Sequence, residues 1–466
     1  MKAASLRGPL LLAALCAIPL ALWGLEGPLE DRFADPYSAF TSAGVALALV
    51  GVTSFALNLV LGARLALVDR LFGGLDKMYK VHQVNGRVAF LLLAGHACLI
   101  VAGRATLSLE SALGLFTPSA GWTIGLGVLA LAAMAVSIAL TLYARLNHEV
   151  FVYVQRSFGF IFLLGAAHVF LNPGATASSP VLTWYLAVVA IAGVGAFTYR
   201  SLFDDVLVRR YDFRVTRARP LNPAVMEITM SPADGPLAHE PGQFVYVTFA
   251  SRGMDDELHP ITIESEGPSE VITIRSGAVH NQFHPFSITS APGDRDLRVV
   301  VKAVGDYTRA MRALEQGASA RVEGPYGKFS YRRAQGRRQV WIAGGIGITP
   351  FLGMARSLRD PDLDIVLFYA VKELSDAVFL DELESIARAV PGFSLVLVVE
   401  AEEGFVTADL VAARTGGLED KDFLVCGPPV MINALRAQLA ARGVPASRVH
   451  FELFGFVQRQ TQRARR

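Results

Sequence analysis

Charge is spread unevenly along this chain, and no other feature of the sequence limits its fold as strongly. The chain has 43 basic and 41 acidic residues, and 20 of these 84 lie among the first 200 positions. Charged residues make up 18% of the chain, against roughly 25% in an ordinary soluble domain, and hydrophobic residues make up 52%. The sequence therefore predicts a membrane-embedded half followed by a soluble half.

The net charge and the cysteines exclude other classes of protein. A net charge of +2 leaves no excess of basic residues for nucleic acid, so we expect no nucleic-acid partner. Cys16, Cys98 and Cys426 lie in different segments, which excludes a disulfide framework and the ligand spacing of a zinc site.

Six apolar runs in the first half approach the ~20 residues that cross the hydrocarbon core of a bilayer. The first run could also be a signal peptide, because Lys2 and Arg7 precede it. No small-x-small cleavage site follows, so we favour a retained helix. We expect a six-helix transmembrane bundle in a lipid bilayer, with spans near 9–24, 41–62, 82–102, 122–144, 151–171 and 181–199.

The loops between these runs predict the orientation of the chain, because basic residues stay on the cytoplasmic side of a membrane. Every second loop carries the basic residues, and the opposite loops are acidic or nearly uncharged. We therefore expect a multi-pass protein of the cell inner (plasma) membrane, with both termini and the soluble half in the cytoplasm. The basic residues on the inner side are Arg64, Arg70, Lys77, Lys80, Arg145, Arg200, Arg209 and Arg210.

Histidines in the third and fifth spans are candidate metal ligands, because ionisable groups at membrane depth are costly and are often functional. His82 and His96 are 14 residues apart, about 21 Å along a helix, and point the same way. His96 and His168 both lie toward the outer ends of their spans, which suits a haem iron held by two imidazoles. Two hydrogen-bonded histidines inside a bundle are the simpler alternative.

An inner haem site is harder to assemble from these residues. His148 precedes His168 by 20 residues, about 30 Å, which places His148 at the interface rather than at the depth of His82. The residue of the fifth span nearest that depth is Gln155, and glutamine is a poor haem ligand. Whether His82 binds a second haem therefore stays open.

The soluble half changes pattern twice. After Arg210 come short β-branched runs broken by Gly and Pro, namely FVYVTF (244–249), VITI (271–274) and LRVVVKAV (297–304). These predict an antiparallel β-barrel. From about position 339 strands, glycine turns and helices alternate, which predicts an α/β domain with a parallel sheet and crossover helices.

Two turns of the α/β part are candidates for dinucleotide binding. GGIGITP (344–350) follows a strand and opens a helix, so backbone N–H groups near Gly344, Gly345 and Gly347 can approach a pyrophosphate. Thr349 is placed to bond the nicotinamide side, and Pro350 suits a first helical turn. CGPP (426–429) ends a later strand, at the sheet edge where ligands bind. Each turn alone could be ordinary, but together they favour a dinucleotide site.

Six motifs stand in the order found in ferredoxin-reductase-type flavoproteins, and the membrane half resembles the ferric reductase transmembrane domain. The whole chain resembles the ferric reductase and NADPH oxidase superfamily. The resemblance implies a transmembrane domain over 1–204, an FAD-binding domain over 205–336 and an NAD(P)H-binding domain over 337–466. It also implies FAD, NADPH or NADH, and haem b as cofactors. The motifs are HPFSITS (284–290), KAVGDYT (302–308), GPYG (324–327), GGIGITP (344–350), CGPP (426–429) and FELFGF (451–456).

The resemblance also implies roles for single residues. Ser287 would lie near the reactive edge of the flavin, Cys426 near the point of hydride transfer, and Phe456 over the flavin ring. Ten residues follow Phe456, and Cys426 could simply pack as a small buried side chain. The further binding residues are His284, Pro285 and Phe286 beside the flavin, Gly305, Thr308, Gly324 and Gly327 at the FAD phosphates, and Gly427 and Pro428 beside Cys426.

The sequence departs from the family pattern at three places. Gln155 stands where relatives place the inner haem ligand, and Ile100 stands where animal oxidases have a further histidine. HPITIES (259–265) is similar to HPFSITS (284–290). We assign the flavin-flanking role to HPFSITS, because the continuation that is usual in the family, up to KAVGDYT, follows it. The strand DIVLFYAV ends at Lys372 and Glu373, which give opposite indications about a ribose 2′-phosphate.

The expected activity is transfer of electrons from cytoplasmic NAD(P)H, through FAD and membrane haem, to an acceptor on the outer face. A ferric or other metal chelate or a periplasmic redox protein is the preferred acceptor, and reduction of O₂ to superoxide is the alternative. Two further alternatives stay open, a non-enzymatic membrane haem protein or transporter with a regulatory soluble half, and a flavin reductase merely anchored to the membrane. Arg87 and Arg104 could meet haem propionates or serve as interfacial anchors.

Overall fold

The computed structural model divides into two compact units, Met1–Val208 and Arg209–Arg466. The described residues are 2–144, 148–172, 179–203, 208–250, 261–262, 271–272, 283–303 and 306–453.

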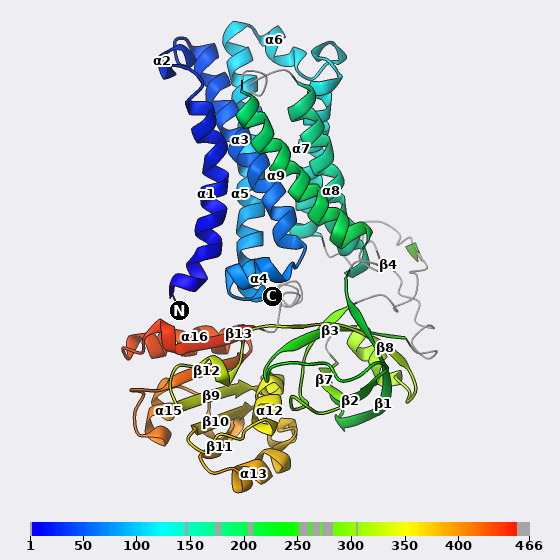
Figure 1. Cartoon of the computed structure of the whole chain (residues 1–466), viewed down its shortest axis with the longest axis vertical. Helices are drawn as coiled ribbons and strands as arrows, with labels where there is room; N and C mark the ends of the chain where they lie inside the picture. Colours follow the sequence, from blue (N-terminus) through cyan, green and yellow to red (C-terminus); the bar gives the residue numbers. More distant parts are fainter. Residues whose placement is uncertain are drawn as a thin grey trace. The chain divides into compact units, whose positions relative to one another are not determined.

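The first unit is helical, and its long helices run side by side (Figure 1). Six of its described helices are long and apolar enough to cross a membrane, which confirms the six predicted spans. Short helices α2 (Leu29–Arg32), α4 (Ala66–Phe72) and α6 (Leu109–Gly114) lie between them, and a π-helical turn over Thr198–Leu202 follows the last. The long helices are α1 (Lys2–Gly24), α3 (Pro36–Gly62), α5 (Leu75–Leu107), α7 (Trp122–Tyr143), α8 (His148–Leu171) and α9 (Pro180–Phe197).

Helices α3 and α5 pack along most of their length, because small residues let their backbones approach. A Cβ atom on Gly51 would lie 3.0 Å from the side chain of Leu93, and one on Gly95 would lie 2.9 Å from that of Leu47. Helix α3 starts sharply, because Asp35 accepts a hydrogen bond from the backbone N–H of Ser38 at 3.1 Å. Contacts of this kind fix the register of α3 against α5, which carries two of the candidate histidines.

An antiparallel sheet forms the first part of the second unit. Its strands follow the order β6-β3-β8-β1-β2-β7 and enclose a core of buried aliphatic and aromatic side chains. The edge strands β6 and β7 approach each other, and one isolated bridge joins Ile288 to Val299. The predicted antiparallel sheet is confirmed, but within the described residues a single bridge stands where a closed barrel needs a full ladder. The strands are β1 (Arg210–Asn222), β2 (Val225–Pro232), β3 (Phe244–Ala250), β6 (His284–Ser287), β7 (Leu297–Lys302) and β8 (Ser319–Tyr326).

Short elements join these strands. Strands β4 (Ile261–Thr262) and β5 (Val271–Ile272) pair with each other, so the predicted strand at 271–274 is confirmed over its first two residues. Helix α11 (Asp306–Ala310) follows β7. The sequence HPITIES overlaps the described residues only at 261–262.

A parallel five-stranded sheet with crossover helices forms the rest of the second unit, as predicted. Its strand order is β11-β10-β9-β12-β13, which places β9 at the centre with β12 beside it. The strands are β9 (Arg338–Gly344), β10 (Asp364–Val371), β11 (Phe393–Val399), β12 (Asp422–Gly427) and β13 (Val449–Leu453). The helices are α12 (Thr349–Arg356), α13 (Leu380–Ala389), α14 (Glu400–Glu403), α15 (Ala408–Thr415) and α16 (Pro429–Ala441).

Both faces of this sheet are buried because helices cover each of them, and successive residues of a strand point to opposite faces. Trp341 and Ala343 of β9 pack with α12 and α13 on one face, and Val340 and Ile342 pack with α15 and α16 on the other. The first face also contacts Val225 and Val300 of the antiparallel sheet, so the two sheets of the second unit share a hydrophobic core.

Candidate cofactor sites

The three candidate metal-ligating histidines of the first unit share one hydrogen-bonding arrangement. The Nδ1 atom of His96 lies 3.0 Å from the carbonyl oxygen of Gly44, and that of His168 lies 2.8 Å from the carbonyl oxygen of Thr123. His82 repeats this with the carbonyl oxygen of Asn58 at 3.1 Å. A carbonyl oxygen only accepts, so Nδ1 carries the proton and Nε2 keeps the lone pair that binds a metal.

His96 of α5 and His168 of α8 are brought toward each other. The two imidazoles lie close enough for His168 to act electrostatically on His96. The His168 ring has room because Gly127 of α7 faces it, where a Cβ atom would lie 2.9 Å from two ring atoms. Two imidazoles with their Nε2 atoms left for a metal are residues that would hold the iron of haem b. Among the described residues no group of three or more His, Cys, Asp or Glu is arranged to hold a metal ion, and a bis-imidazole haem needs only two.

The surroundings of His82 are different. Its ring stands edge-on to Tyr79 at 6.3 Å, and Asn85 one turn later donates to the backbone oxygen of Ser54 at 2.9 Å. On α8 the Nε2 atom of Gln155 donates to the Thr141 hydroxyl of α7 at 3.1 Å. The side chain of Gln155 is therefore engaged with α7. The residues present do not supply His82 with a second strong ligand from this position.

The four predicted flavin-flanking residues form strand β6, which pairs with β3. Ser287 is 6% exposed, and its Oγ atom has no hydrogen-bond partner within the described residues. A buried hydroxyl without a partner costs about 1–3 kcal/mol, which a polar atom of a ligand would offset. Pro285 is exposed and Phe286 half-buried, so one end of the strand is open to a ligand. These observations fit FAD on this strand.

His284 stacks on Tyr307, a residue for which the sequence predicts no role. Their ring centroids are 3.9 Å apart with an interplanar angle of 22°. The Tyr307 hydroxyl accepts a hydrogen bond from the backbone N–H of Phe249 at 3.2 Å, and burial raises its pKa to about 12. Thr308 follows Tyr307 in α11. The sequence carries no local signal for this contact, because the contact depends on how α11 returns to the sheet.

The predicted phosphate-approaching glycines at the end of β8 adopt conformations that favour glycine. Gly324 has φ +133° and Gly327 has φ +99°. The Gly327 carbonyl accepts a hydrogen bond from the Gln243 side chain at 3.2 Å, and a Cβ atom on Gly327 would lie 3.1 Å from the Phe244 ring. The backbone here is therefore held close to β3, next to the flavin-flanking strand.

The two predicted dinucleotide turns lie against each other. Strand β9 ends at Gly344, a 3₁₀ turn covers Gly345–Ile348, and α12 starts at Thr349. A Cβ atom on Gly347 would lie 2.4 Å from the carbonyl oxygen of Cys426, and one on Gly344 would lie 2.9 Å from Pro428. Only glycine permits this approach, so the turns after β9 and β12 form one surface at the carboxyl edge of the sheet.

The exposed part of this surface is small. Gly345, with φ +53°, is half-buried, and Pro428 is exposed, whereas Gly427 is buried. Thr349 is buried and its hydroxyl donates to the Ile346 carbonyl at 3.1 Å. Pro350 occupies the first turn of α12, as predicted. Lys372 is exposed after β10, and its carbonyl accepts a hydrogen bond from Ala401 at 3.3 Å.

Cys426 is fully buried in the core on the α12 face of the sheet. Burial raises the pKa of its thiol well above the usual range, and nearby Glu452 raises it further. Its carbonyl contacts the glycine turn. Phe456 and Gly305, which also had predicted roles, lie outside the described residues.

The Cys426 thiol is expected to resist alkylation in the folded protein. In a Cys16→Ser, Cys98→Ser background, N-ethylmaleimide should label Cys426 at least about 100-fold more slowly than in the unfolded chain, because the thiolate is both disfavoured and inaccessible. The rate should stay low as the pH rises through about 8.5, where an exposed thiol ionises. Mass spectrometry of native and denatured samples measures this, and rapid native labelling would contradict the buried position.

Three family profiles match successive parts of the chain. One described as "Ferric reductase like transmembrane component" matches residues 47–166. One described as "FAD-binding domain" matches residues 271–330, and one described as "Oxidoreductase NAD-binding domain" matches residues 341–437.

Curated relatives match only part of the chain. It is 33% identical over 184 residues to the electron transfer component of 2-halobenzoate 1,2-dioxygenase from Burkholderia cepacia, covering 36% of this chain and 53% of that protein. It is 30% identical over 200 residues to NADH-cytochrome b5 reductase 1 from Pyricularia oryzae, covering 39% of this chain and 64% of that protein. The chain thus spans between half and two thirds of the length of these two relatives.

Among solved structures, the chain is similar to the flavohem-like FAD/NAD-binding domain of nitric oxide dioxygenase from Vibrio cholerae. The two share 22% identity with a TM-score of 0.39, over 53% of this chain and 98% of that one. Together, the three profiles confirm the resemblance read from the motifs. The chain joins a ferric reductase-like transmembrane domain to the FAD-binding and NAD-binding domains of a ferredoxin-reductase-type module.

Proposed function

We propose that this protein is a transmembrane oxidoreductase that takes electrons from cytoplasmic NAD(P)H and delivers them to an acceptor on the outer face. Its proposed cofactors are FAD and haem b, at about one haem per FAD. We assign the membrane domain to 1–204, the FAD domain to 205–336 and the NAD(P)H domain to 337–466. Both termini then lie in the cytoplasm, since the basic loops face that side. The family profiles support the coarser statement, a transmembrane NAD(P)H-dependent oxidoreductase.

The arrangement of His96 and His168 carries the haem assignment. Each imidazole is held by a main-chain carbonyl through Nδ1, and each comes from a different membrane helix. When bound, flavin supplies the change from two-electron to one-electron chemistry, and haem supplies one-electron transfer within the membrane. We propose that these two histidines would hold the haem iron, each through its Nε2 atom.

In the second unit, the chain's own residues orient the reactants. The glycine turn after β9 offers backbone N–H groups to the pyrophosphate of NAD(P)H, and the buried Ser287 hydroxyl offers a hydrogen bond to the flavin. Cys426, through its backbone contact with Gly347, sets the depth of the coenzyme turn. Phe456, outside the described residues, would cover the flavin.

A single haem is favoured over two by the position of Gln155. Its amide donates to Thr141 of α7, and His82 has no second imidazole at its depth from α8. For the outer acceptor we propose a ferric or other metal chelate. Ile100, one turn after His96, is an apolar residue where the oxygen-reducing relatives have a histidine.

Purified protein in sealed vesicles tests this function. NADH or NADPH added on the side of the second unit should reduce a ferric chelate trapped on the opposite side, at a haem-to-FAD ratio of about one. Formation of superoxide without reduction of the chelate would indicate that O₂ is the acceptor instead. Haem-free protein that still reduces soluble dyes would indicate a merely anchored flavin reductase, and haem that NAD(P)H never reduces would indicate a non-enzymatic haem protein.

A further inference from the structure

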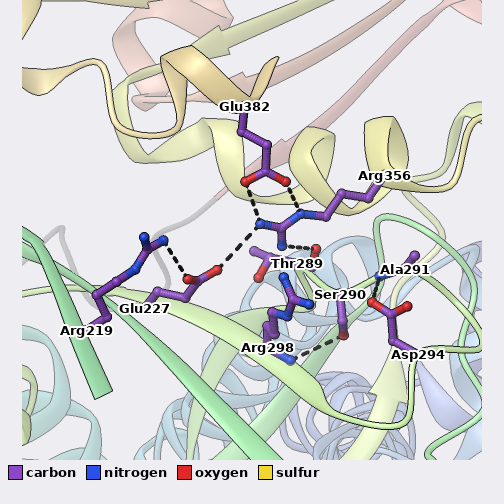
Figure 2. Close-up of polar contacts among 9 residues, drawn as sticks. All are labelled: Arg219, Glu227, Thr289, Ser290, Ala291, Asp294, Arg298, Arg356 and Glu382. Atoms are coloured by element: carbon purple, nitrogen blue, oxygen red, sulfur yellow. Dashed lines mark hydrogen bonds and ion pairs between the residues drawn. The ribbon is translucent and has the colours of Figure 1, made fainter. Parts of the chain in front are cut away.

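Arg356, the last residue of α12, lies buried between the two sheets of the second unit (Figure 2). Only 9% of its side chain is exposed. Its Nε and Nη2 atoms donate to both carboxylate oxygens of Glu382 in α13, at 2.6 and 2.9 Å. Its Nη1 atom donates to the Thr289 carbonyl at 2.7 Å, and Glu227 of β2 lies 3.5 Å from Nη2. One side chain therefore joins the parallel sheet to the antiparallel sheet.

The Thr289 carbonyl belongs to the segment that leaves the candidate flavin strand. Thr289 follows Ser287 by two residues, and its own N–H donates to the Arg298 carbonyl at 2.9 Å. The N–H of Ile288 donates to the Gln243 carbonyl at 2.9 Å. The segment is thus fixed to the antiparallel sheet through its N–H groups, and to α12 through the carbonyl of Thr289.

Gly353 makes a second contact with this segment, one turn before Arg356 on the same face of α12. A Cβ atom on Gly353 would lie 2.6 Å from the Ile288 carbonyl oxygen. The backbone of α12 therefore contacts the Ile288 carbonyl directly, and Arg356 donates a hydrogen bond to the Thr289 carbonyl. Contacts three residues apart lie together on a helix, so the two act on one short stretch of chain.

The other end of α12 starts at the coenzyme turn. Eight residues of α-helix span about 12 Å, and the turn before them lies against the backbone of Cys426 and Gly427. A short, rigid helix thus connects the candidate pyrophosphate turn with the segment behind Ser287.

We propose that Arg356 is a positioning residue for hydride transfer, holding the strand that carries Ser287 at a fixed place relative to the coenzyme turn. This inference rests on the proposed function. The step it serves breaks the C4–H bond of the nicotinamide and moves the hydride, with its two electrons, to flavin N5, leaving NAD(P)⁺ and reduced flavin. Arg356 touches neither reactant and acts through the Thr289 carbonyl.

The chemistry of the contact requires arginine. The planar guanidinium binds Glu382 with two parallel N–H groups and still has another nitrogen for the Thr289 carbonyl. Glu227, which also accepts from Arg219 at 2.9 Å, adds a second carboxylate beside the buried cation. A lysine keeps the charge but cannot form the paired bonds and the carbonyl bond together.

Arg356→Lys in the full-length, detergent-purified protein tests the inference. Its matched control is Arg333→Lys, because Arg333 also donates two hydrogen bonds to one carboxylate, Glu240, at 3.2 and 2.9 Å, but on an exposed surface. Stopped-flow reduction of the flavin by NADH and NADPH should slow roughly 10- to 100-fold in Arg356→Lys, because displacements near 1 Å have that effect. The dissociation constant of the coenzyme should change far less, and Arg333→Lys should leave both unchanged.

Two further readouts separate positioning from loss of fold. The charge-transfer absorbance between nicotinamide and flavin should weaken in Arg356→Lys, while chemically reduced flavin should still be reoxidised by ferricyanide at the wild-type rate. In FAD-free protein, hydrogen–deuterium exchange should quicken in the peptide covering 284–290 and stay unchanged in Arg333→Lys. Wild-type rates of flavin reduction and peptide exchange in Arg356→Lys would overturn the inference.

Gly353→Ala provides a second variant that leaves the guanidinium in place. The added Cβ presses on the Ile288 carbonyl, so it should slow flavin reduction and weaken the charge-transfer band as Arg356→Lys does. If Arg356→Lys fails to fold, this variant decides the question. FAD lost from Gly353→Ala and Arg356→Lys but kept in Arg333→Lys would overturn positioning in favour of flavin retention. Failure of NAD(P)H to reduce the wild-type flavin would instead overturn the proposed function itself.

Discussion

Replacing His96 with alanine is expected to remove haem from the purified protein and to abolish electron delivery across the bilayer. The imidazole is one of the two that lie near each other on different membrane helices, and a haem with only one of these two histidines left would be held weakly. Flavin reduction by NAD(P)H should continue, because the residues proposed to bind FAD and NAD(P)H belong to the other compact unit, Arg209–Arg466. The haem-to-FAD ratio and a reduced-minus-oxidised spectrum measure both effects, with a fall from about one haem per FAD to none.

His82→Ala is the matched control, since His82 lies on the same helix and bonds a carbonyl oxygen in the same way. It should keep its haem, whereas His168→Ala should lose haem as His96→Ala does. Haem retained by His96→Ala and lost by His82→Ala would move the site to the inner half of the bundle. Two haems in the unmodified protein would show that the inner site forms in spite of Gln155.

Gly347→Ala is expected to abolish use of NAD(P)H while leaving FAD bound. The new Cβ would lie 2.4 Å from the carbonyl oxygen of Cys426 and 2.9 Å from the Cα of Gly427. Both are backbone atoms of strand β12, so they cannot move aside as a flexible side chain does. Overpacking costs typically 1–3 kcal/mol, occasionally more, and here it separates the two turns that form the coenzyme surface. Flavin reduction by NADH should fall at least about 100-fold.

Gly443→Ala controls for the loss of a glycine elsewhere in the same domain. Gly443 has φ +79° and open space around its Cβ position, so its replacement costs backbone strain of about 1–2 kcal/mol and no collision. NADH should reduce the flavin of Gly443→Ala at the wild-type rate. Coenzyme titrations and thermal melting of both variants distinguish local displacement from loss of fold. A wild-type rate in Gly347→Ala would exclude the turn as the coenzyme site.

The features that the sequence predicts well are those that depend on neighbouring residues. Hydropathy over some 20 residues identifies each membrane helix, and the run VWIAGGIGITP already contains a strand, a glycine turn and a helix start. The juxtaposition of GGIGITP with CGPP also follows from the sequence, because central parallel strands end at one edge. For this reason the candidate coenzyme turn could be predicted from the residues, before the structure.

The features that escape prediction join residues far apart in the sequence. Nothing around Arg356 indicates that its partners are at 227, 289 and 382, and Gly353 reads as an ordinary helical glycine. The stack of His284 on Tyr307 likewise depends on how α11 returns to the sheet. Closure of the barrel depends on the pairing of its edge strands, and in the described residues one isolated bridge joins them. The alternation of apolar and polar residues within a strand does not predict how edge strands pair.

The carbonyl acceptors of the three histidines have a consequence for how this protein tolerates mutation. Because Asn58 and Thr123 contribute main-chain oxygens, a substitution at either changes a side chain and preserves the bond to the imidazole, whereas a Cβ atom on Gly44 would lie 3.1 Å from the Ile100 side chain. The orientation of each imidazole ring is therefore set by the packing of the helices, not by the identity of a partner side chain. The side chains at Asn58 and Thr123 can therefore change without rotating a ligand, whereas a slide of one helix by a single residue would misalign it.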